Sequence, residues 1–279
     1  MKQWENQVCV ITGAASGIGA GLVRHAASLG MKVVAADIDM SGLAALKRDA
    51  EGEIDIVSTD VTLGSAMESL AEYSLGRHGE VNLLFNNAGV LVDGKSWERT
   101  EHDWQWNLNV NVMGVVNGIR AFVPRMLAQG SPGRVVNTSS IGGLLGGGQF
   151  MGPYQASKHA VSAITETLFQ ELALESAPVT ASCLCPGEVD TQIWESDRLR
   201  DPRERNQLAS EAEQQFHDQV AGMVAEGLTP KEFAHRVWEG IEADRFWIFP
   251  QKEFKAMFQV RVDSILKETQ PAAIADLMR

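Results

Sequence analysis

A glycine-rich stretch near the amino terminus constrains the fold of this chain more than any other feature. The β-favouring residues 8–11 lead into Thr12-Gly13, and Gly17 and Gly19 follow at short spacing. Residues 18–29 then place apolar side chains at helical intervals, which predicts a strand, a tight turn and a helix in succession. Glycine lets the backbone approach a ligand closely, and a helix N-terminus attracts an anionic group. The stretch therefore predicts a binding site for the pyrophosphate of a dinucleotide.

The composition argues against several classes of partner. Of 279 residues, 24 are Lys or Arg and 36 are Asp or Glu, which gives a formal net charge of −12. This acidic balance disfavours nucleic acid and anionic membranes. The sequence has no run of about 18 apolar residues, and residues 1–7 do not resemble a signal peptide. We therefore expect a soluble, cytoplasmic protein that binds neither nucleic acid nor membrane.

The cysteines Cys9, Cys183 and Cys185 are too few for a disulfide framework. Cys183 and Cys185 lie in a run that favours a strand, and we expect their side chains to face opposite sides of it and not to chelate one metal together. Buried, reduced packing residues are the favoured interpretation. No metal site is predicted.

Carboxylates follow the next two predicted strands. Residues 32–37 favour a short buried strand ending at Asp37, roughly 18 to 20 residues beyond the glycine turn. A carboxylate there accepts hydrogen bonds from both adenosine ribose hydroxyls and repels a 2′-phosphate, which favours NAD over NADP; the alternative is a surface acid at a strand end. After the strand at 54–57, Asp60 is open between a cofactor contact and the N-cap of a helix beginning near Leu63.

Strands and helices alternate along the rest of the chain. Strand-favouring runs occur at 81–85, 133–138, 179–185 and 246–250, with helical segments between them. The alternation predicts an α/β fold: a doubly wound, Rossmann-type parallel sheet of about seven strands with helices on both faces, in a single domain.

Within this domain, which spans residues 1–279, we expect three parts. Residues 6–190 form the cofactor-binding and catalytic core, and residues 229–279 form a helix, the last strand and a terminal helix. Residues 191–228 carry many charges and few β-formers. A connection of this length is usually functional, so we expect a mobile helical lid that binds the substrate.

Several motifs, taken in order, identify a family. They are Thr12-Gly13-x-x-x-Gly17-x-Gly19, Asp60-Val61, Asn86-Asn87-Ala88-Gly89, Asn111-x-x-Gly114, Ser140 with Tyr154-x-x-x-Lys158, and Pro186-Gly187 with Thr191. Over residues 6–250 the chain resembles the classical short-chain dehydrogenase/reductase family. The resemblance implies an NAD-dependent oxidoreductase that interconverts a secondary alcohol and a ketone.

The resemblance makes Tyr154 the catalytic acid/base. A phenol with a pKa of about 10 is a weak base at neutral pH, so we expect the Lys158 ammonium, on the same helix face, to lower that pKa. In the family this lysine also holds the nicotinamide ribose.

Ser140 would position the substrate oxygen and stabilise its developing charge. We prefer it to Ser139 because Ser140-x-Gly-Gly fits the family pattern and strand alternation lets only one of them face the site. Ser140 precedes Tyr154 by 14 residues, which is longer than the usual family gap by about one residue. Asn111 would complete a proton relay by holding a water with its backbone carbonyl. Asn109 competes for this role, but the downstream Gly114 favours Asn111.

The cofactor contacts are carried over from the family motifs. Where NADP-preferring members carry a basic residue, this chain has Ser16 and Ile38. The expected NAD-binding residues are Gly13, Ser16, Gly17, Ile18, Gly19, Asp37, Asp60, Val61, Asn87, Ala88, Gly89, Tyr154, Lys158, Pro186, Gly187, Val189 and Thr191.

The family layout also predicts an apolar substrate pocket. Its expected residues are Ser140, Leu144, Leu145, Phe150, Met151, Trp194 and Met223. Arg198, Arg200, Arg203 and Arg205 alternate with acids, so we expect them to be self-compensated on a solvated helix. The pocket favours a bulky hydrophobic substrate of alicyclic, aromatic or steroid type.

Other functions remain open alternatives. A non-catalytic dinucleotide-binding sensor or scaffold would need the glycine turn and Asp37 but not Ser140, Tyr154 and Lys158. A family member acting on a polar sugar or hydroxy acid is a further candidate, and an extended-type lyase or epimerase usually has a different glycine spacing. Relatives pair the helices near 111–126 and 154–175 across a two-fold axis, so we expect a homodimer or homotetramer.

Overall fold

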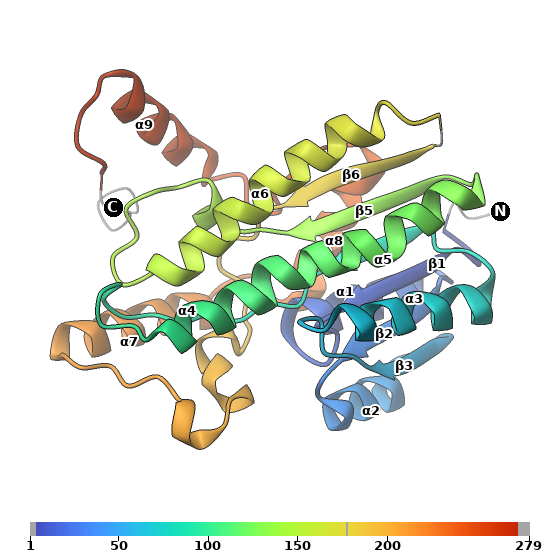
Figure 1. Cartoon of the computed structure of the whole chain (residues 1–279), viewed down its shortest axis with the longest axis horizontal. Helices are drawn as coiled ribbons and strands as arrows, with labels where there is room; N and C mark the ends of the chain where they lie inside the picture. Colours follow the sequence, from blue (N-terminus) through green and yellow to red (C-terminus); the bar gives the residue numbers. More distant parts are fainter. Residues whose placement is uncertain (1–3, 177, 273–279) are drawn as a thin grey trace.

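The computed structural model describes residues 4–176 and 178–272, and within them one sheet has seven parallel strands (Figure 1). Their order is β3-β2-β1-β4-β5-β6-β7. The strands are β1 (Val8–Thr12), β2 (Lys32–Asp37), β3 (Ile54–Ser58), β4 (Leu83–Asn86), β5 (Gly133–Thr138), β6 (Val179–Leu184) and β7 (Trp247–Ile248). The winding direction reverses between β1 and β4, which is where sheets of this kind bind ligands. The predicted doubly wound, single-domain fold is confirmed.

Helices cover both faces of the sheet. On one face α3 (Gly64–His78), α5 (Gly114–Gln129) and α6 (Gly152–Leu172) form one core with alternate residues of β1. On the other face α1 (Gly17–Ser28), α2 (Met40–Asp49) and α8 (Pro230–Glu242) form a second core with the remaining β1 residues. Figure 1 shows α3, α5 and α6 in front of the sheet and α1 and α8 behind it. Successive strand residues point to opposite faces, so all of β1 is buried.

The other helical segments lie beyond the carboxyl ends of the strands or at the chain end. They are α4 (Glu101–Leu108), the π-helical η1 (Asn109–Met113), the short 3₁₀ segments η2 (Ile141–Gly143), η3 (Ile193–Leu199) and η4 (Pro202–Glu204), α7 (Glu211–Ala225) and α9 (Lys255–Leu266). The segment predicted as a lid thus contains η3, η4 and α7. Residues 1–3 and 273–279, the two ends of the predicted domain, lie outside the described residues. No described helix combines the length and apolar character that a membrane span requires.

The start of α3 decides whether Asp60 is the N-cap of this helix. Leu63 is the N-cap residue of this helix. Asp60 Oδ1 instead accepts hydrogen bonds from the backbone amide and the hydroxyl of Thr62, at 2.9 and 2.7 Å. Asp60 is therefore not the N-cap, and it lines the cavity described below.

The expectation that Cys183 and Cys185 face opposite sides of their strand is wrong. Their sulfur atoms lie 3.8 Å apart, because residues two apart in a strand share a face. All three cysteines are buried and free of disulfides. Among the described residues, no group of three or more His, Cys, Asp or Glu side chains is placed to hold a metal ion.

Tight packing between α1 and α8 supports a first prediction. A Cβ on Gly21 of α1 would lie 2.8 Å from the carbonyl carbon of Pro230 at the start of α8. We expect Gly21→Ala to lower the free energy of unfolding by about 1 to 3 kcal/mol, because overpacking pushes the two helices apart. Urea unfolding measures this change.

Gly76→Ala on α3 is the matched control. Nothing lies within 4 Å of a Cβ at Gly76, so this helical substitution should be neutral or stabilising by up to about 1 kcal/mol. Equal stability of the two variants would contradict the tight contact at Gly21.

Candidate active site

A cavity of about 580 Å³ opens at the carboxyl ends of the strands, over the point where the winding reverses. Its wall contains the glycine turn, the ends of β2, β4, β5 and β6, the start of α6, and parts of η3 and α7. These segments are far apart in sequence, and the parallel sheet brings them to one edge. The volume lies within the usual range of small-molecule and cofactor sites.

The glycine turn packs directly on the residues after β4. A Cβ on Gly13, whose φ is +65°, would lie 2.7 Å from the Cα of Ala88. The Thr12 hydroxyl accepts hydrogen bonds from the backbone amides of Asn87 and Ala88, at 3.0 and 3.1 Å. Gly17 has a φ of +51°, and a Cβ there would lie 2.9 Å from Cγ2 of Thr191. The turn therefore fits a dinucleotide-binding loop, and its shape requires that Gly13 and Gly17 have no side chain.

Asp37 lies at the end of β2 beside this turn. Its Oδ2 accepts from the Ala15 amide at 2.9 Å, and its Oδ1 accepts from the Asp39 amide at 3.0 Å. Both bonds hold the carboxylate at the cavity wall. A carboxylate in this position fits the ribose hydroxyls of an adenosine.

Arg198 of η3 lines the same cavity, which the sequence analysis did not expect. The Ser41 hydroxyl and the Gly42 amide lower the pKa of the Asp39 carboxyl, and the Arg198 charge lowers it further. The guanidinium also donates to the Gln192 and Glu195 carbonyls, at 3.0 and 3.1 Å. One cation from the lid segment thus lies near the acids at the end of β2.

The residues predicted to be catalytic, Ser140, Tyr154 and Lys158, meet at the other end of the cavity. Ser140 follows β5 and caps η2, where its hydroxyl accepts from the Gly142 amide at 3.0 Å. Tyr154 lies in the first turn of α6, and Lys158 follows one turn later. Lys158 Nζ lies 5.7 Å from the Tyr154 ring centre and donates to the Thr138 carbonyl at 2.9 Å.

Ser139 and Ser140 are distinguished by their hydroxyl partners. The Ser139 hydroxyl lies 2.8 Å from the Lys158 carbonyl and 2.8 Å from the Ser162 hydroxyl, inside the α6 contact. The Ser140 hydroxyl instead lowers the pKa of Tyr154 through a hydrogen bond. Only Ser140 therefore acts on the tyrosine.

Burial dominates the electrostatics of Tyr154 and Lys158. It raises the pKa of Tyr154, and the hydrogen bond from Ser140 offsets only part of that rise. It also lowers the pKa of Lys158 to about 8, with a smaller opposing effect from Cys183 and Cys185. The net lowering of the Tyr154 pKa that the sequence predicts is therefore not seen in this structure, because desolvation of the phenolate by burial outweighs the hydrogen bond from Ser140.

Asn111 lies within η1, where the helix between α4 and α5 becomes π-helical. Its Oδ1 accepts from the Val90 amide at 2.8 Å, and its Nδ2 donates to the Val90 carbonyl and the Ser157 hydroxyl, both at 2.9 Å. Asn111 is buried and Asn109 is exposed. Asn111 does not line the cavity, and its side chain joins the segment after β4 to α6.

Most of the predicted site residues line one cavity. All of the expected NAD-binding residues do, and so do Ser140, Leu145, Met151, Trp194 and Met223 of the expected substrate pocket. Leu144 and Phe150 do not. The Leu144 carbonyl accepts a hydrogen bond from Arg261, and the Phe150 ring packs edge-on against Phe216.

Several cavity residues were missed by the sequence analysis. They are Leu91, Trp106, Gln149, Gln155, Glu188, Arg198, Phe216, Gln219 and Val220. Burial raises the pKa of the Glu188 carboxyl, and the negative charge of Glu253 raises it further. The cavity wall is therefore not purely apolar, because Glu188 and the positively charged Arg198 belong to it.

Arg200 corrects the expectation of self-compensated arginines on a solvated helix. Its side chain is buried, lies 2.7 Å from Asp103 Oδ1 and 3.2 Å from Asp197 Oδ1, and stacks over the Trp106 ring. Arg203 fits the expectation, since it is exposed and pairs with Asp201. Only the tertiary contact with α4 distinguishes the two arginines.

Gln251, after β7, fixes the turn after β6. It is 4 % exposed. Its Oε1 accepts from the Gly187 amide at 3.1 Å, and its Nε2 donates to the Glu188 carbonyl at 2.5 Å. No local pattern marks this glutamine, because its partners lie more than 60 residues earlier in the chain.

Comparison with known proteins gives consistent matches. The sequence model of short chain dehydrogenases matches residues 7–202. The chain is 35% identical to the 1-deoxy-11-beta-hydroxypentalenate dehydrogenase of Streptomyces avermitilis over 245 residues, which cover 86% of this chain and 83% of that protein.

Solved structures agree with this result. A short chain dehydrogenase/reductase from Burkholderia phymatum in complex with NAD has a TM-score of 0.92 and 39% identity, with 98% of each chain covered. An actinorhodin polyketide ketoreductase with NADPH has a TM-score of 0.72 and 28% identity, with 88% of this chain and 96% of that chain covered.

The buried charge of Lys158 gives a prediction on stability. Its pKa of about 8 in the folded protein lies below its ordinary value of 10.5. The unfolded chain therefore binds more protons between these values, and the contribution of Lys158 to stability rises with pH across that window. We expect Lys158→Met to be more stable than the wild type at pH 7 and to lose this advantage as the pH rises above about 8.

Urea unfolding of both proteins without NAD, at several pH values between about 7 and 10, measures the difference. Comparing two proteins that differ only at Lys158 removes the contributions of other titrating groups. A stability difference that stays constant with pH would contradict the buried charge.

Proposed function

Because the chain belongs to the short-chain dehydrogenase/reductase family of oxidoreductases, we propose that it interconverts a secondary alcohol and a ketone with NAD as the hydride carrier. The observation that carries this proposal is that Ser140, Tyr154 and Lys158 share one cavity with Asp37 and the glycine turn. A sensor or scaffold that only binds a dinucleotide would need the turn and the acid, but not the three reactive side chains.

In this proposal Tyr154 transfers the proton. NAD supplies a two-electron acceptor for the hydride that leaves the alcohol carbon. The hydroxyl proton passes to the Tyr154 oxygen, while Ser140 donates a hydrogen bond to the substrate oxygen. In ketone reduction the phenol returns this proton. Since burial raises the pKa of Tyr154, the phenol is favoured at neutral pH, and alcohol oxidation should gain from alkaline pH.

Lys158 and Asn111 support this transfer. The Lys158 ammonium would hold the nicotinamide ribose hydroxyls and stabilise the phenolate as it forms. Asn111 is a positioning residue, because its amide ties the Val90 backbone to Ser157. Its backbone carbonyl would hold a water that relays the proton to solvent.

For the substrate we favour a bulky hydrophobic secondary alcohol or ketone of alicyclic, aromatic or steroid type. Leu145, Met151, Trp194, Phe216 and Met223 line the cavity. Apolar surface rewards burial by about 25 cal/mol per Å² and gives little to a small polyol. Residues 191–228 would act as the substrate-binding lid, since they supply three of these side chains.

The competing class is a sugar or hydroxy acid held by the polar members of the wall. Glu188, Arg198 and the glutamines of the wall could recognise such a substrate. A comparison of kcat/KM across bulky apolar alcohols, sugars and short hydroxy acids separates the classes. A clear preference for a sugar or a charged acid would contradict the hydrophobic assignment.

For the cofactor we favour NAD over NADP. The comparisons include one structure with NAD and one with NADPH, so the choice rests on the residues of this chain. Asp37 would repel a 2′-phosphate, and Ser16 and Ile38 stand where a basic residue would attract one.

We also propose a homodimer or homotetramer formed through α5 and α6. A mass measured by light scattering would reveal two or four chains.

The Tyr154→Phe variant tests the proposed function. It deletes only the ionisable oxygen, so we expect alcohol oxidation to fall by roughly 10²–10⁴-fold, the usual contribution of an acid/base group. NAD affinity, measured by fluorescence titration, should stay within about threefold of the wild type. Absorbance of reduced nicotinamide measures turnover.

Lys158→Ala is the comparison variant, and it should damage both turnover and NAD affinity. Retention of more than about a tenth of the wild-type kcat by Tyr154→Phe would falsify the acid/base assignment.

Cofactor choice gives a further prediction. The double variant Asp37→Ala/Ile38→Arg should move the ratio of kcat/KM for NAD to that for NADP toward NADP by at least about 100-fold, because it removes a repulsive carboxylate and adds an attractive guanidinium. Arg198→Ala is the control, because it removes the positive charge of the lid segment from the cavity and leaves Asp37 and Ile38 unchanged. Equal wild-type kcat/KM for the two cofactors would overturn the assignment of NAD.

A further inference from the structure

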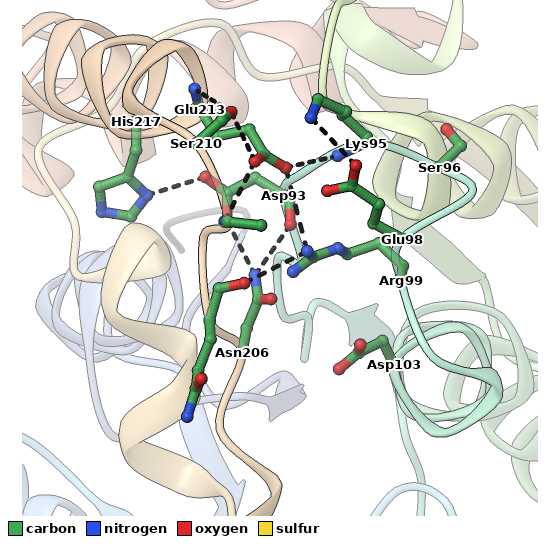
Figure 2. A network of polar contacts seen from close by, with 12 residues as sticks. Asp93, Lys95, Ser96, Glu98, Arg99, Asp103, Asn206, Ser210, Glu213 and His217 are labelled. Carbon is green, nitrogen blue, oxygen red and sulfur yellow. Dashed lines mark hydrogen bonds and ion pairs between the residues drawn. The ribbon is translucent and has the colours of Figure 1, made fainter.

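Helix α7 presents two different faces to the rest of the molecule. Phe216, Val220 and Met223, spaced at helical intervals, line the substrate end of the cavity. Glu213 and His217, four residues apart, lie on the adjacent side of the helix and face the loop of residues 93–99 (Figure 2). The position of the cavity wall therefore depends on how the second face is held.

Glu213 anchors the beginning of the helix. Its carboxylate is fully buried. It accepts hydrogen bonds from the Lys95 amide at 2.9 Å, the Ser210 hydroxyl at 2.8 Å and the Ala209 amide at 3.1 Å. Arg99 lies 3.9 Å away and supplies a positive charge. A buried carboxylate is tolerated only with such partners, so this contact fixes α7 on the loop.

One helical turn later, His217 of α7 forms a second contact with the loop, through Asp93. The carboxylate now comes from the loop: Asp93 is 5 % exposed, and its Oδ2 lies 2.8 Å from His217 Nδ1. Asn206 donates to the Asp93 carbonyl at 2.8 Å and to its Oδ1 at 3.3 Å. Figure 2 shows His217 on one side of Asp93 and Asn206 on another. The imidazole is thus held in one orientation.

The same imidazole also contacts the indole ring of Trp194. The two ring centres lie 5.5 Å apart at an interplanar angle of 87°. Trp194 lines the cavity, whereas His217 does not. Asp93 therefore contacts His217, His217 contacts Trp194, and Trp194 lines the cavity.

We propose that Asp93 and His217 are positioning residues that set substrate selectivity, because they hold the Trp194 ring against the substrate space. This inference rests on the proposed oxidoreductase function and names residues that act on its substrate wall. His217 reaches no reacting atom, so it acts through the indole. The pair should raise the affinity for a bulky substrate and leave the chemical step and NAD binding unchanged.

The first test compares His217→Ala with the wild type on a bulky alicyclic alcohol and on 2-propanol. We expect KM for the bulky alcohol to rise by roughly tenfold, with kcat and the kinetics for 2-propanol within about threefold. NAD affinity should not change. Asp93→Ala should have the same effect, and the double variant should lose little more than either single variant, because the two residues act as one unit.

His217→Asn separates the ring from the hydrogen bond. Its amide can still donate to Asp93 but offers no ring to Trp194. We expect it to behave like His217→Ala. Recovery of wild-type selectivity by His217→Asn would show that the hydrogen bond alone matters, and it would overturn the proposed role of the ring.

His102→Ala is the matched control. His102 Nε2 lies 3.3 Å from Glu204 Oε2, so this pair likewise joins a histidine to a carboxylate, here between α4 and the lid segment. The pair is half-exposed, and among the described residues the ring partners of Trp194 are Phe216 and His217. We expect its selectivity to match the wild type.

Deuterium exchange keeps the inference independent of turnover. The backbone amides of η3 and α7 should exchange roughly tenfold faster in His217→Ala than in the wild type and in His102→Ala. If the wild type oxidises no alcohol, the proposed function fails, and the exchange experiment alone decides whether the pair orders the wall. Unchanged selectivity in an active enzyme, or unchanged exchange in an inactive one, overturns the inference.

Discussion

The contact between the glycine turn and the residues after β4 is the constraint on which the site depends. At Gly13 there is no room for a Cβ beside Ala88, and the Thr12 hydroxyl accepts both backbone amides that follow the strand. The two segments are more than 70 residues apart in the chain. Their close approach fixes the cleft at the reversal of winding, and through the Ala15 amide it also fixes the Asp37 carboxylate. A side chain at Gly13 would separate these segments and widen the cleft.

The reactive end of the cavity is organised at some energetic cost to the fold. Lys158 is buried and donates to a backbone carbonyl, and desolvation favours the neutral forms of both Lys158 and Tyr154. Neither side chain is needed for the apolar core, since α6 packs on the sheet through Leu168 and Leu172 further along the helix. The first two turns of α6 thus carry the buried polar groups that the proposed mechanism uses, and the later turns carry the groups that stabilise the fold.

The sequence was informative wherever a local pattern has one structural consequence. Strands that end in Asp or Asn, or that lead into the glycine turn, could be placed, and parallel pairing then brings their ends together without further information. The pattern was misleading or silent where a partner comes from a distant element. Arg200 and Arg203 look alike in the sequence, yet only Arg200 meets Asp103 and the Trp106 ring. Gln251 and Arg198 were missed for the same reason, and the pKa of Tyr154 depends on burial that no motif encodes.

The lid differs from the core in the kind of interaction that holds it. The sheet and its helices are joined by two apolar cores. Besides the ring contacts of Phe216, α7 and the segment before it are held on the 93–103 region by Glu213, Asp93, Arg99 and Arg200. Polar contacts demand specific geometry, while apolar contacts tolerate repacking. A change in these polar contacts can therefore reshape the cavity wall while the two apolar cores of the sheet stay packed. Under the proposed function, substrate selectivity and folding would therefore depend on different sets of residues.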